Sequence, residues 1–367
     1  MANLYSPTRS SPPQAAPSTL KFSIVVPTRN RADCLSTALQ SIKRQTYAGF
    51  EVIVVDDGSR ACCRARYAEI WRMLDERFRL ICISPDDAPG VGPAAARNLG
   101  ISEASGEFLA FCDDDDYWCA DDHLAVAAEA LSTTPDADIY YANQAAFRSG
   151  EMFNTERWPQ LCDWLSKAPK VGSLDVCRLP HEAFLQPGGI AHLNISIVRR
   201  SLAEEIGGFW NQLRFEEDFD FYLRSIDRAR ELLYRPTIVA HHRAPDLQSR
   251  DNASTALNQT ERWLAQCMAC EHIRVTARTR QVIKLACKTQ GYTLRHLTMA
   301  LYKNNQYEAA VTAGAQALAI LPGLRWLLFM VYLRTRAAIG FLPRWLRRAT
   351  ARRSDFHRSR YREAGVR

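Results

Sequence analysis

Residues 92–118, GPAAARNLGISEASGEFLAFCDDDDYW, place a helical pattern, a buried strand and four consecutive aspartates in direct succession. The helical part is closed by Gly106, and the apolar run that follows it has the length of a buried strand. The run ends on Asp113–Asp116, whose adjacent carboxylates repel one another. Each carboxylate needs water, a hydrogen-bond donor or a cation to stay ionised, and the rest of the sequence indicates which of these is present.

The chain before this stretch repeats the alternation of strand and helix. Apolar runs in KFSIVVPTRN, EVIVVDDGS and FRLICIS predict three strands, with amphipathic helices between them. This pattern predicts an α/β fold with a mostly parallel, Rossmann-like sheet flanked by helices. Ligands bind beyond the carboxyl ends of the strands in such sheets, so the polar residues found there should converge on one rim: Pro27–Asn30, Asp56–Ser59 and Asp113–Asp116.

The chain after this stretch is less regular and then becomes helical. DIYYA and AHLNISIV have strand character, FEEDFDFYLRSI predicts a helix, and ELLYRPTIVAHHRAP predicts a strand that runs into a polar loop. From Thr255 to about Leu321 the pattern is all helical and contains one helix pair of tetratricopeptide type. A single unit of this type cannot bury its own apolar face, so we expect it to pack on the preceding helices.

The positive charge is concentrated at the C-terminus. The whole chain of 367 residues has a net charge of +7, whereas residues 322–367 alone contain twelve arginines against two acidic residues. The remainder is therefore slightly acidic, which argues against a nucleic-acid partner. The eleven cysteines show no paired metal-ligand spacing, and we interpret them as reduced thiols of a cytoplasmic protein.

The two ends of the chain carry separate expectations. Residues 1–20 are rich in Ser and Pro and lack an apolar core, so we expect a disordered lead-in and no signal peptide. The run WLLFMVYLRTRAAIGFL is apolar, but Arg334 and Arg336 make it a poor membrane span, since a central arginine costs roughly 2.5–3.5 kcal/mol. It is either an amphipathic segment on the inner face of the cell membrane or a core helix followed by a disordered basic tail.

The polar clusters suit a particular chemistry. Asp113 and Asp115 form a D-x-D pair, and if the strand continues through them both side chains point to one face. Asp114 and Asp116 would then face donors such as Arg97 or backbone amides. Carboxylates at this position hold a hard divalent cation that binds phosphate oxygens, although a solvated acidic loop remains an alternative.

Four segments together carry a family resemblance. FSIVVPTRNR, VIVVDDGS, residues 92–118 and EEDFDFYLR resemble, in this order, the signatures of family-2 glycosyltransferases of the GT-A fold, over about residues 21–243. The resemblance implies an inverting transferase of the hexosyltransferase type that uses a nucleotide-diphosphate sugar, with UDP-sugars favoured, and Mn²⁺ or Mg²⁺. It implies a hydroxyl acceptor, saccharide or lipid-linked, in the synthesis of a surface polysaccharide or glycoconjugate. The domains would be a GT-A domain at 21–250, a helical extension at 251–321 and an amphipathic, basic tail at 322–367.

The resemblance also implies roles for individual residues. Asp218 is the expected general base, with Glu216, Glu217 and Asp220 as competitors in the same helix. The implied metal ligands are Asp113, Asp115 and His242, with His241 as the alternative to His242. The implied donor-binding residues are Pro27, Thr28, Arg29, Asn30, Asp56, Asp57, Arg97, Asp113 and Asp114. Trp118 and Trp210 would form either a stacking wall for a sugar or part of the core.

Two other functions remain to be weighed against this one. A nucleotidyltransferase acting on sugar phosphates also joins metal-binding aspartates to an α/β sheet, but it needs a glycine-rich basic loop, and PTRNRADC contains no glycine. A catalytically inactive GT-A scaffold protein is the non-enzymatic alternative. The intact D-x-D and Glu-Asp residues argue against it.

Overall fold

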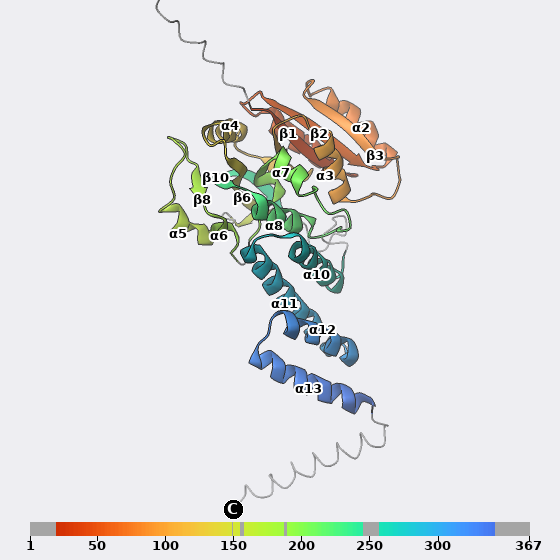
Figure 1. Ribbon diagram of the computed structural model, residues 1–367. Coiled ribbons are helices and arrows are strands. Elements are labelled where there is room, and N and C mark those ends of the chain that lie inside the picture. The colour runs from red at the N-terminus through yellow and green to blue at the C-terminus, as the bar shows by residue number, and fades with distance from the viewer. Residues whose placement is uncertain (1–19, 149, 155–157, 187–188, 245–256, 342–367) are drawn as a thin grey trace, which may run out of the picture.

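The computed structural model describes residues 20–341 except 149, 155–157, 187–188 and 245–256. An α/β domain forms one end of the molecule, and a series of helices leads away from it to the other end (Figure 1). The predicted lead-in at 1–20, apart from Leu20, and the tail beyond 341 lie outside the described residues. The predicted fold class is confirmed.

The N-terminal half of the sheet is parallel. Its strands follow the order β3-β2-β1-β4, and the apolar residues of β1 and β2 are almost wholly buried. The strands are β1 (Phe22–Thr28), β2 (Phe50–Asp57), β3 (Phe78–Ser84) and β4 (Phe108–Phe111), and the helices between them are α1 (Ala32–Lys43), α2 (Ala61–Trp71) and α3 (Pro93–Ser102). Gly100 lets α3 lie close to β1, because a Cβ at this position would be 2.3 Å from Val25 Cγ1.

The second half of the sheet is mixed. β9 (Ser196–Arg199) pairs antiparallel with both β4 and β6 (Ala137–Arg148), and β10 (Glu231–Arg243) runs parallel to β6. The predicted strand AHLNISIV is only half right, because residues 193–195 form a 3₁₀ turn before β9. The remaining strands are β5 (Tyr117–Trp118), β7 (Glu151–Asn154) and β8 (Cys177–Leu179). The remaining helices of this domain are α4 (His123–Thr133), α5 (Cys162–Leu165), α6 (His181–Phe184), α7 (Arg200–Glu205) and α8 (Glu217–Arg228).

The four aspartates do not continue β4. The strand ends at Phe111, and the N–H of Asp116 donates to the carbonyl of Asp113 (3.1 Å), which closes a turn. The expectation that Asp113 and Asp115 share one face of a strand is therefore wrong. The turn directs the four carboxylates to different hydrogen-bond and ion-pair partners.

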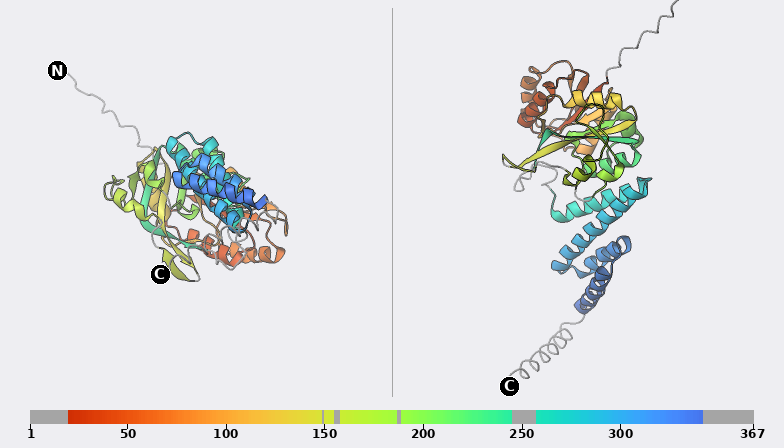
Figure 2. Two further views of the ribbon diagram at one scale, coloured as in Figure 1. Left: turned by 90° about the horizontal axis from the view of Figure 1, so that it is seen from below. Right: turned by 90° about the vertical axis from the view of Figure 1, so that its left-hand side faces the viewer.

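The helices after the α/β domain are α10 (Gln259–Thr276), α11 (Arg280–Lys303) and α12 (Tyr307–Ile320) of the predicted helical extension, and α13 (Leu324–Phe341) of the predicted tail. A capping box at Asn258 begins α10. The Asn258 side chain accepts from Glu261 N–H, and the Glu261 carboxylate accepts from Asn258 N–H. The helices pack in sequence, with α10 against α8 and α13 at the far end (Figure 2). Within the described part of the chain, no helix has the length and apolar character needed to cross a membrane.

Candidate active site

The ends of β1, β2 and β4 meet at one rim of the sheet. Thr28 lies beside Asp56 in the β1–β2 register, and its hydroxyl donates to Asp114 Oδ2 (2.8 Å). Asn30 adopts a left-handed conformation (φ 61°), in which its N–H donates to Ser59 Oγ (2.8 Å) and its side-chain oxygen accepts from Arg60 N–H (2.7 Å). The polar residues after Pro27 thus tie the first strand to the loops that follow the other two.

The aspartates of the turn are engaged by donors from several separate parts of the chain. Asp113 accepts from Arg97 (2.6 Å), whereas Asp114 and Asp115 share the guanidinium of Arg31 (3.0 and 2.8 Å). Asp116 points inward and is held by the Asn194 side-chain amide (2.7 Å), by Arg243 N–H (2.9 Å) and by His242. Asp114 and Asp116 are both buried. Arg97 or backbone amides were the donors expected for them; Asp116 accepts from the backbone N–H of Arg243, whereas Arg97 pairs with Asp113.

The turn carries more negative charge than its partners neutralise. Burial and the neighbouring carboxylates Asp116 and Asp114 raise the pKa of Asp115 to about 7, and burial also raises the pKa of Asp114 and Asp116. A divalent cation would relieve this repulsion, and oxygen ligands are the ones that Mg²⁺ and Mn²⁺ prefer. Asp115 is the carboxylate with the most to gain, since Arg31, which it shares with Asp114, is its one ion-pair partner among the described residues.

His242 and His241 occupy different places. His242 Nδ1 lies 3.1 Å from Asp116 Oδ1, and its ring stacks on His192 at 4.3 Å. His241 instead contacts the Tyr117 hydroxyl through Nδ1 (2.6 Å). A carboxylate on one ring nitrogen orients the other toward a cation, so the geometry favours His242 over His241 as a ligand.

The site fits a cation with few protein ligands. Asp113, Asp115 and His242 are each directed to a separate partner, and among the described residues no three His, Cys, Asp or Glu side chains are gathered to enclose a metal ion. Mg²⁺ commonly takes one or two carboxylates and completes its sphere with water and substrate phosphates. Asp115 and His242 suit this arrangement.

The acidic pair at the end of β2 holds the chain segments that precede α2 and α3. Asp56 accepts from Ser59 N–H (3.1 Å) and from Arg64 Nε (2.7 Å). Asp57 accepts from the N–H groups of Val91 (2.8 Å) and Gly92 (2.9 Å).

Both carboxylates of this pair keep acceptor capacity beyond these bonds, because an ionised carboxylate has about four acceptor sites. Arg29 supports the same loop by donating to Ala88 O (2.9 Å).

A second acidic cluster opens α8. Glu217 accepts from Arg97 Nη1 (2.8 Å), and Asp220 accepts from Arg224 and contacts His272 Nδ1 (2.7 Å). Asp218 has no side-chain partner in the described chain; its Oδ1 accepts from the N–H of Phe219. Burial raises the pKa of Asp218, and Asp113 adds to this, while Arg97 opposes it.

Arg97 joins the two acidic clusters. One end of its buried guanidinium donates to Asp113 of the turn and the other to Glu217 of α8. Burial by itself lowers the pKa of this guanidinium, but the two carboxylates outweigh it, so the net shift is upward. Arg97 was expected to face Asp114 or Asp116 and to bind the donor; in this structure it pairs with the carboxylates of Asp113 and Glu217.

Several residues of the site were not singled out from the sequence. Arg31 directly follows the PTRN segment, so its position could have suggested it. Asn194 lies in the turn before β9, and no sequence motif around it indicates a role in the site. Trp118 is wholly buried, with its Nε1 donating to Asn194 O (2.8 Å), so it belongs to the core and forms no sugar-stacking wall. Trp210 stacks on His272 at 4.2 Å.

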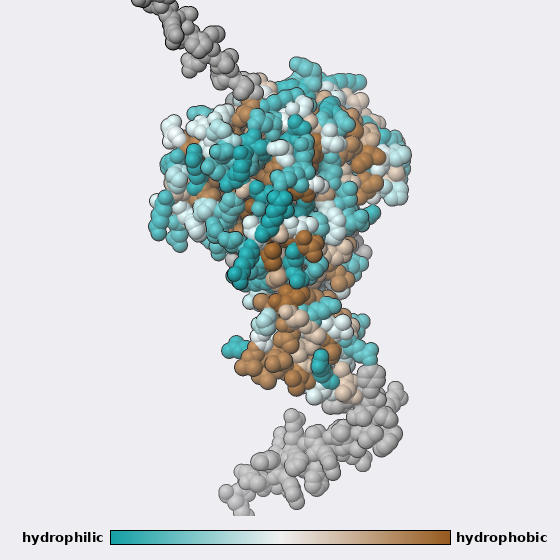
Figure 3. Space-filling model, viewed as in Figure 1, coloured by the Kyte–Doolittle hydropathy of each residue, from teal (hydrophilic) through white to brown (hydrophobic). Residues whose placement is uncertain are grey.

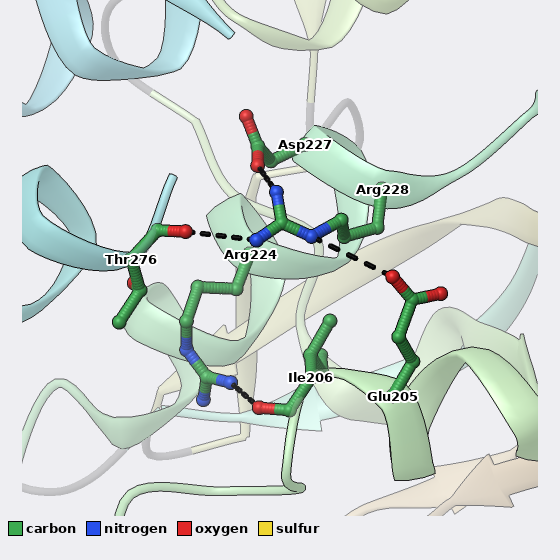
Figure 4. A pocket seen from close by; sticks show the side chains of 6 residues that line it. All are labelled: Glu205, Ile206, Arg224, Asp227, Arg228 and Thr276. Atoms are coloured by element: carbon green, nitrogen blue, oxygen red, sulfur yellow. Dashed lines mark hydrogen bonds and ion pairs between the residues drawn. The ribbon is translucent and has the colours of Figure 1, made fainter. Parts of the chain in front are cut away.

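A pocket at the C-terminal end of α8 is filled by structural hydrogen bonds and ion pairs (Figure 4). Arg228 donates to Thr276 O (2.8 Å) and pairs with Asp227, while Arg224 donates to Ile206 O (2.6 Å). Asp227 also accepts from Thr279 N–H (2.7 Å) at the start of α11. These bonds fasten α8 to the helical extension.

Comparison with known proteins shows the family of the chain. Residues 23–202 match the family described as Glycosyl transferase family 2. An uncharacterized glycosyltransferase of Bacillus subtilis, YwdF, is 31% identical over 236 residues, which span 63% of this chain and 78% of YwdF. A shorter match of 98 residues, 37% identical, covers 27% of this chain and 36% of WfgD of Escherichia coli, named a UDP-Glc:alpha-D-GlcNAc-diphosphoundecaprenol beta-1,3-glucosyltransferase.

Solved structures share the fold. S. aureus TarS in complex with UDP-GlcNAc superposes with a TM-score of 0.61 at 17% identity and covers 83% of this chain and 82% of its own. The mannosyltransferase PcManGT of Pyrobaculum calidifontis, in complex with GDP-Man and Mn²⁺, gives a TM-score of 0.54 at 18% identity over 94% of this chain and 87% of its own.

Proposed function

Because the chain belongs to glycosyl transferase family 2, we propose that this glycosyltransferase moves one sugar from a nucleotide-diphosphate sugar to a hydroxyl acceptor with inversion at the anomeric carbon. The observation that carries the proposal is the Arg97 bridge, which ties the aspartate turn to the acidic start of α8. A donor diphosphate bound at the turn and an acceptor activated at α8 would then lie on two sides of one buried ion-pair network.

The donor side of the site is formed by the ends of the first strands. Asp56 and Asp57 accept hydrogen bonds from the nucleoside, and Pro27–Asn30 line the base. A UDP-sugar is favoured because TarS is solved with UDP-GlcNAc and with UDP. The proposed metal ligands are Asp115 and His242, with Asp113 and Asp114 supporting the donor, and PcManGT is solved with Mn²⁺. A bound Mn²⁺ or Mg²⁺ would neutralise diphosphate charge and improve the leaving group.

The base in this proposal is Asp218. Glu217 is occupied by Arg97 and Asp220 by Arg224 and His272, so neither is free to accept a proton. Asp218 has an open carboxylate, and its Oδ2 can take the proton of the acceptor hydroxyl as that oxygen attacks the anomeric carbon. Burial keeps this carboxylate poorly solvated and so a stronger base toward the hydroxyl.

The acceptor is proposed by class. WfgD is named for an acceptor on diphosphoundecaprenol, which supports a lipid-linked saccharide and a role in the synthesis of a surface polysaccharide or glycoconjugate. The basic C-terminus fits a cytoplasmic enzyme that works at the inner face of the membrane. We divide the chain into a catalytic domain at 21–250, a helical extension at 251–321 and a basic tail at 322–367.

The test is donor turnover by the purified full chain with Mn²⁺ or Mg²⁺ and a panel of nucleotide sugars. We expect release of nucleoside diphosphate from a UDP-sugar, loss of metal stimulation in Asp115→Asn, and unchanged turnover in the control Asp121→Asn, whose side chain is half exposed. Release of pyrophosphate would indicate a nucleotidyltransferase. Failure of every nucleotide sugar to bind in calorimetry would indicate an inactive scaffold.

A further inference from the structure

Helix α13 exposes a continuous apolar stripe. Leu324 and Leu328 are 72% and 62% exposed, and the other members, Leu327, Val331 and Tyr332, are 45–56% exposed. Their spacing of three and four residues places all five on one side of the helix. Hydrophobic surface gathers over this end of the molecule, whereas the visible face of the α/β domain is mostly hydrophilic (Figure 3). We call this stripe the α13 face.

The opposite side of α13 is anchored. Met330 and Leu333 are buried against Ala310 of α12, and Trp326 Nε1 donates to Gly314 O (3.0 Å). Because these contacts fix the rotation of α13 about its axis, the α13 face is directed mainly away from the other helices. At its edge, the Tyr332 hydroxyl lies 3.0 Å from the Tyr302 hydroxyl of α11. It is a surface that the fold presents, and it cannot turn inward without breaking this packing.

The charge around the α13 face has one sign. Arg325 and Arg336 lie along one edge of the stripe and Arg334 lies along the other, as the helical repeat of 3.6 residues requires. In the sequence no acidic residue occurs between Glu308 and Asp355, and residues 342–367 add nine more arginines. An apolar stripe bordered by arginines complements a surface that is apolar within and anionic outside.

We propose that the α13 face lies in the headgroup region of an anionic membrane, with its apolar side chains toward the acyl chains and the bordering arginines on lipid phosphates. The helix lies on the membrane without crossing it, and the other end of the extension is fastened to α8. Membrane binding by the α13 face does not depend on the proposed function. Its role in bringing the catalytic domain to a lipid-linked acceptor does depend on it. A second copy of the chain fits less well, because two α13 faces in contact would bring like-charged arginines together.

The experiment is co-sedimentation of the full chain with vesicles of phosphatidylcholine alone and of phosphatidylcholine with 30% phosphatidylglycerol, a composition of about the anionic content that polybasic segments require. We expect binding to the anionic vesicles at least about tenfold tighter than to the neutral ones, weakened by salt. The variant Leu327→Glu/Leu328→Glu/Val331→Glu should lose at least about tenfold of this binding.

The matched control is Leu264→Glu/Met268→Glu/Val275→Glu, which changes three exposed apolar residues of α10 (46–73% exposed) and adds the same charge. It should bind as the unmodified chain does.

Equal binding by the α13 variant, or no binding of the unmodified chain to anionic vesicles, would overturn the proposal. Light scattering that shows a dimer of the unmodified chain and a monomer of the α13 variant would instead make the face an interface between copies. Donor turnover is measured separately. Vesicle binding without any turnover would contradict the proposed function and leave the membrane proposal intact.

Discussion

The two acidic clusters of the rim have similar composition and opposite environments. The turn at Asp113–Asp116 receives donors from Arg31 just before α1, from α3, from β10 and from the turn before β9, so each carboxylate is engaged. At the start of α8, Glu217 and Asp220 are engaged in the same way, but Asp218 is left without a side-chain partner in the described chain. Carboxylates held in place by ion pairs, as in the turn, suit the binding of a ligand. An unpaired and poorly solvated carboxylate, as at Asp218, suits proton transfer.

Asp218→Asn should have the largest effect, because it removes the open carboxylate and leaves the turn intact. We expect kcat to fall by about 10³-fold, in the usual range for loss of a general base, with the KM for the donor within about twofold. Steady-state kinetics with a UDP-sugar and acceptor would measure both.

The control for this change is Asp163→Asn on the exposed part of α5, which should keep full activity. A variant Asp218→Asn that folds normally and retains more than about a tenth of kcat would show that the base is another group, since general-base catalysis contributes at least about 10²-fold.

Arg97→Met should break the connection between the clusters. It leaves the buried Glu217 carboxylate unpaired, which costs about 3 kcal/mol of unfolding free energy, and it lets Asp113 and α8 move independently, which should lower kcat about 100-fold. Urea unfolding and kinetics would measure the two effects.

The double variant Arg97→Met/Glu217→Gln tests the cause of this instability. It removes the unpaired charge and should recover much of the stability without recovering activity. Recovery of both would mean that the bridge stabilises the fold and has no part in aligning the site.

His272→Phe should have a smaller effect. Asp220 loses the contact with His272 Nδ1 but keeps Arg224, so we expect a cost of about 1 kcal/mol, a Tm lower by roughly 2–4 °C and kcat within about threefold. The exposed His296→Phe is the control. A larger loss of activity than of stability would give α10 a direct part in the site.

The α/β fold and the convergence of the strand ends could be predicted from the sequence, because both follow from local patterns. Apolar runs such as IVV and LAF bury on both faces of a parallel sheet, and parallel strands end at a common rim. The turn at Asp113–Asp116 was missed because an extended strand and a turn fit the same four aspartates. The donors that hold the turn come from distant parts of the chain, so no local pattern indicates them.

The partners within the site could not be predicted, since they depend on contacts across the chain. Arg31 and Asp115 are 84 residues apart, and Arg97 and Glu217 are 120 residues apart. Nothing local in EEDFDFYLR distinguishes Asp218 from its neighbours. The difference arises only when Arg97 pairs with Glu217, and His272, from a helix outside the catalytic domain, reaches Asp220.

Glu216 allows the start of α8 to be tested through the pH dependence of stability. This residue is half-buried at the N-cap of α8, where its backbone is left-handed (φ 66°). Burial and the charges of Asp218 and Glu217 raise its pKa to about 8, and a hydrogen bond from Gln266 of α10 opposes the rise. The Cys270 thiol also faces the Glu216 carboxyl. A carboxyl with a raised folded-state pKa contributes stability below its unfolded pKa of about 4.5, and this contribution is lost as the pH rises through 8.

Glu216→Gln cannot ionise, so its Tm relative to the unmodified chain should be higher at pH 8.5 than at pH 5.5 by roughly 2–4 °C. Differential scanning calorimetry of both chains, with the exposed Glu204→Gln as control, would measure this; a difference that is the same at both pH values would show that Glu216 is ionised in the folded protein throughout.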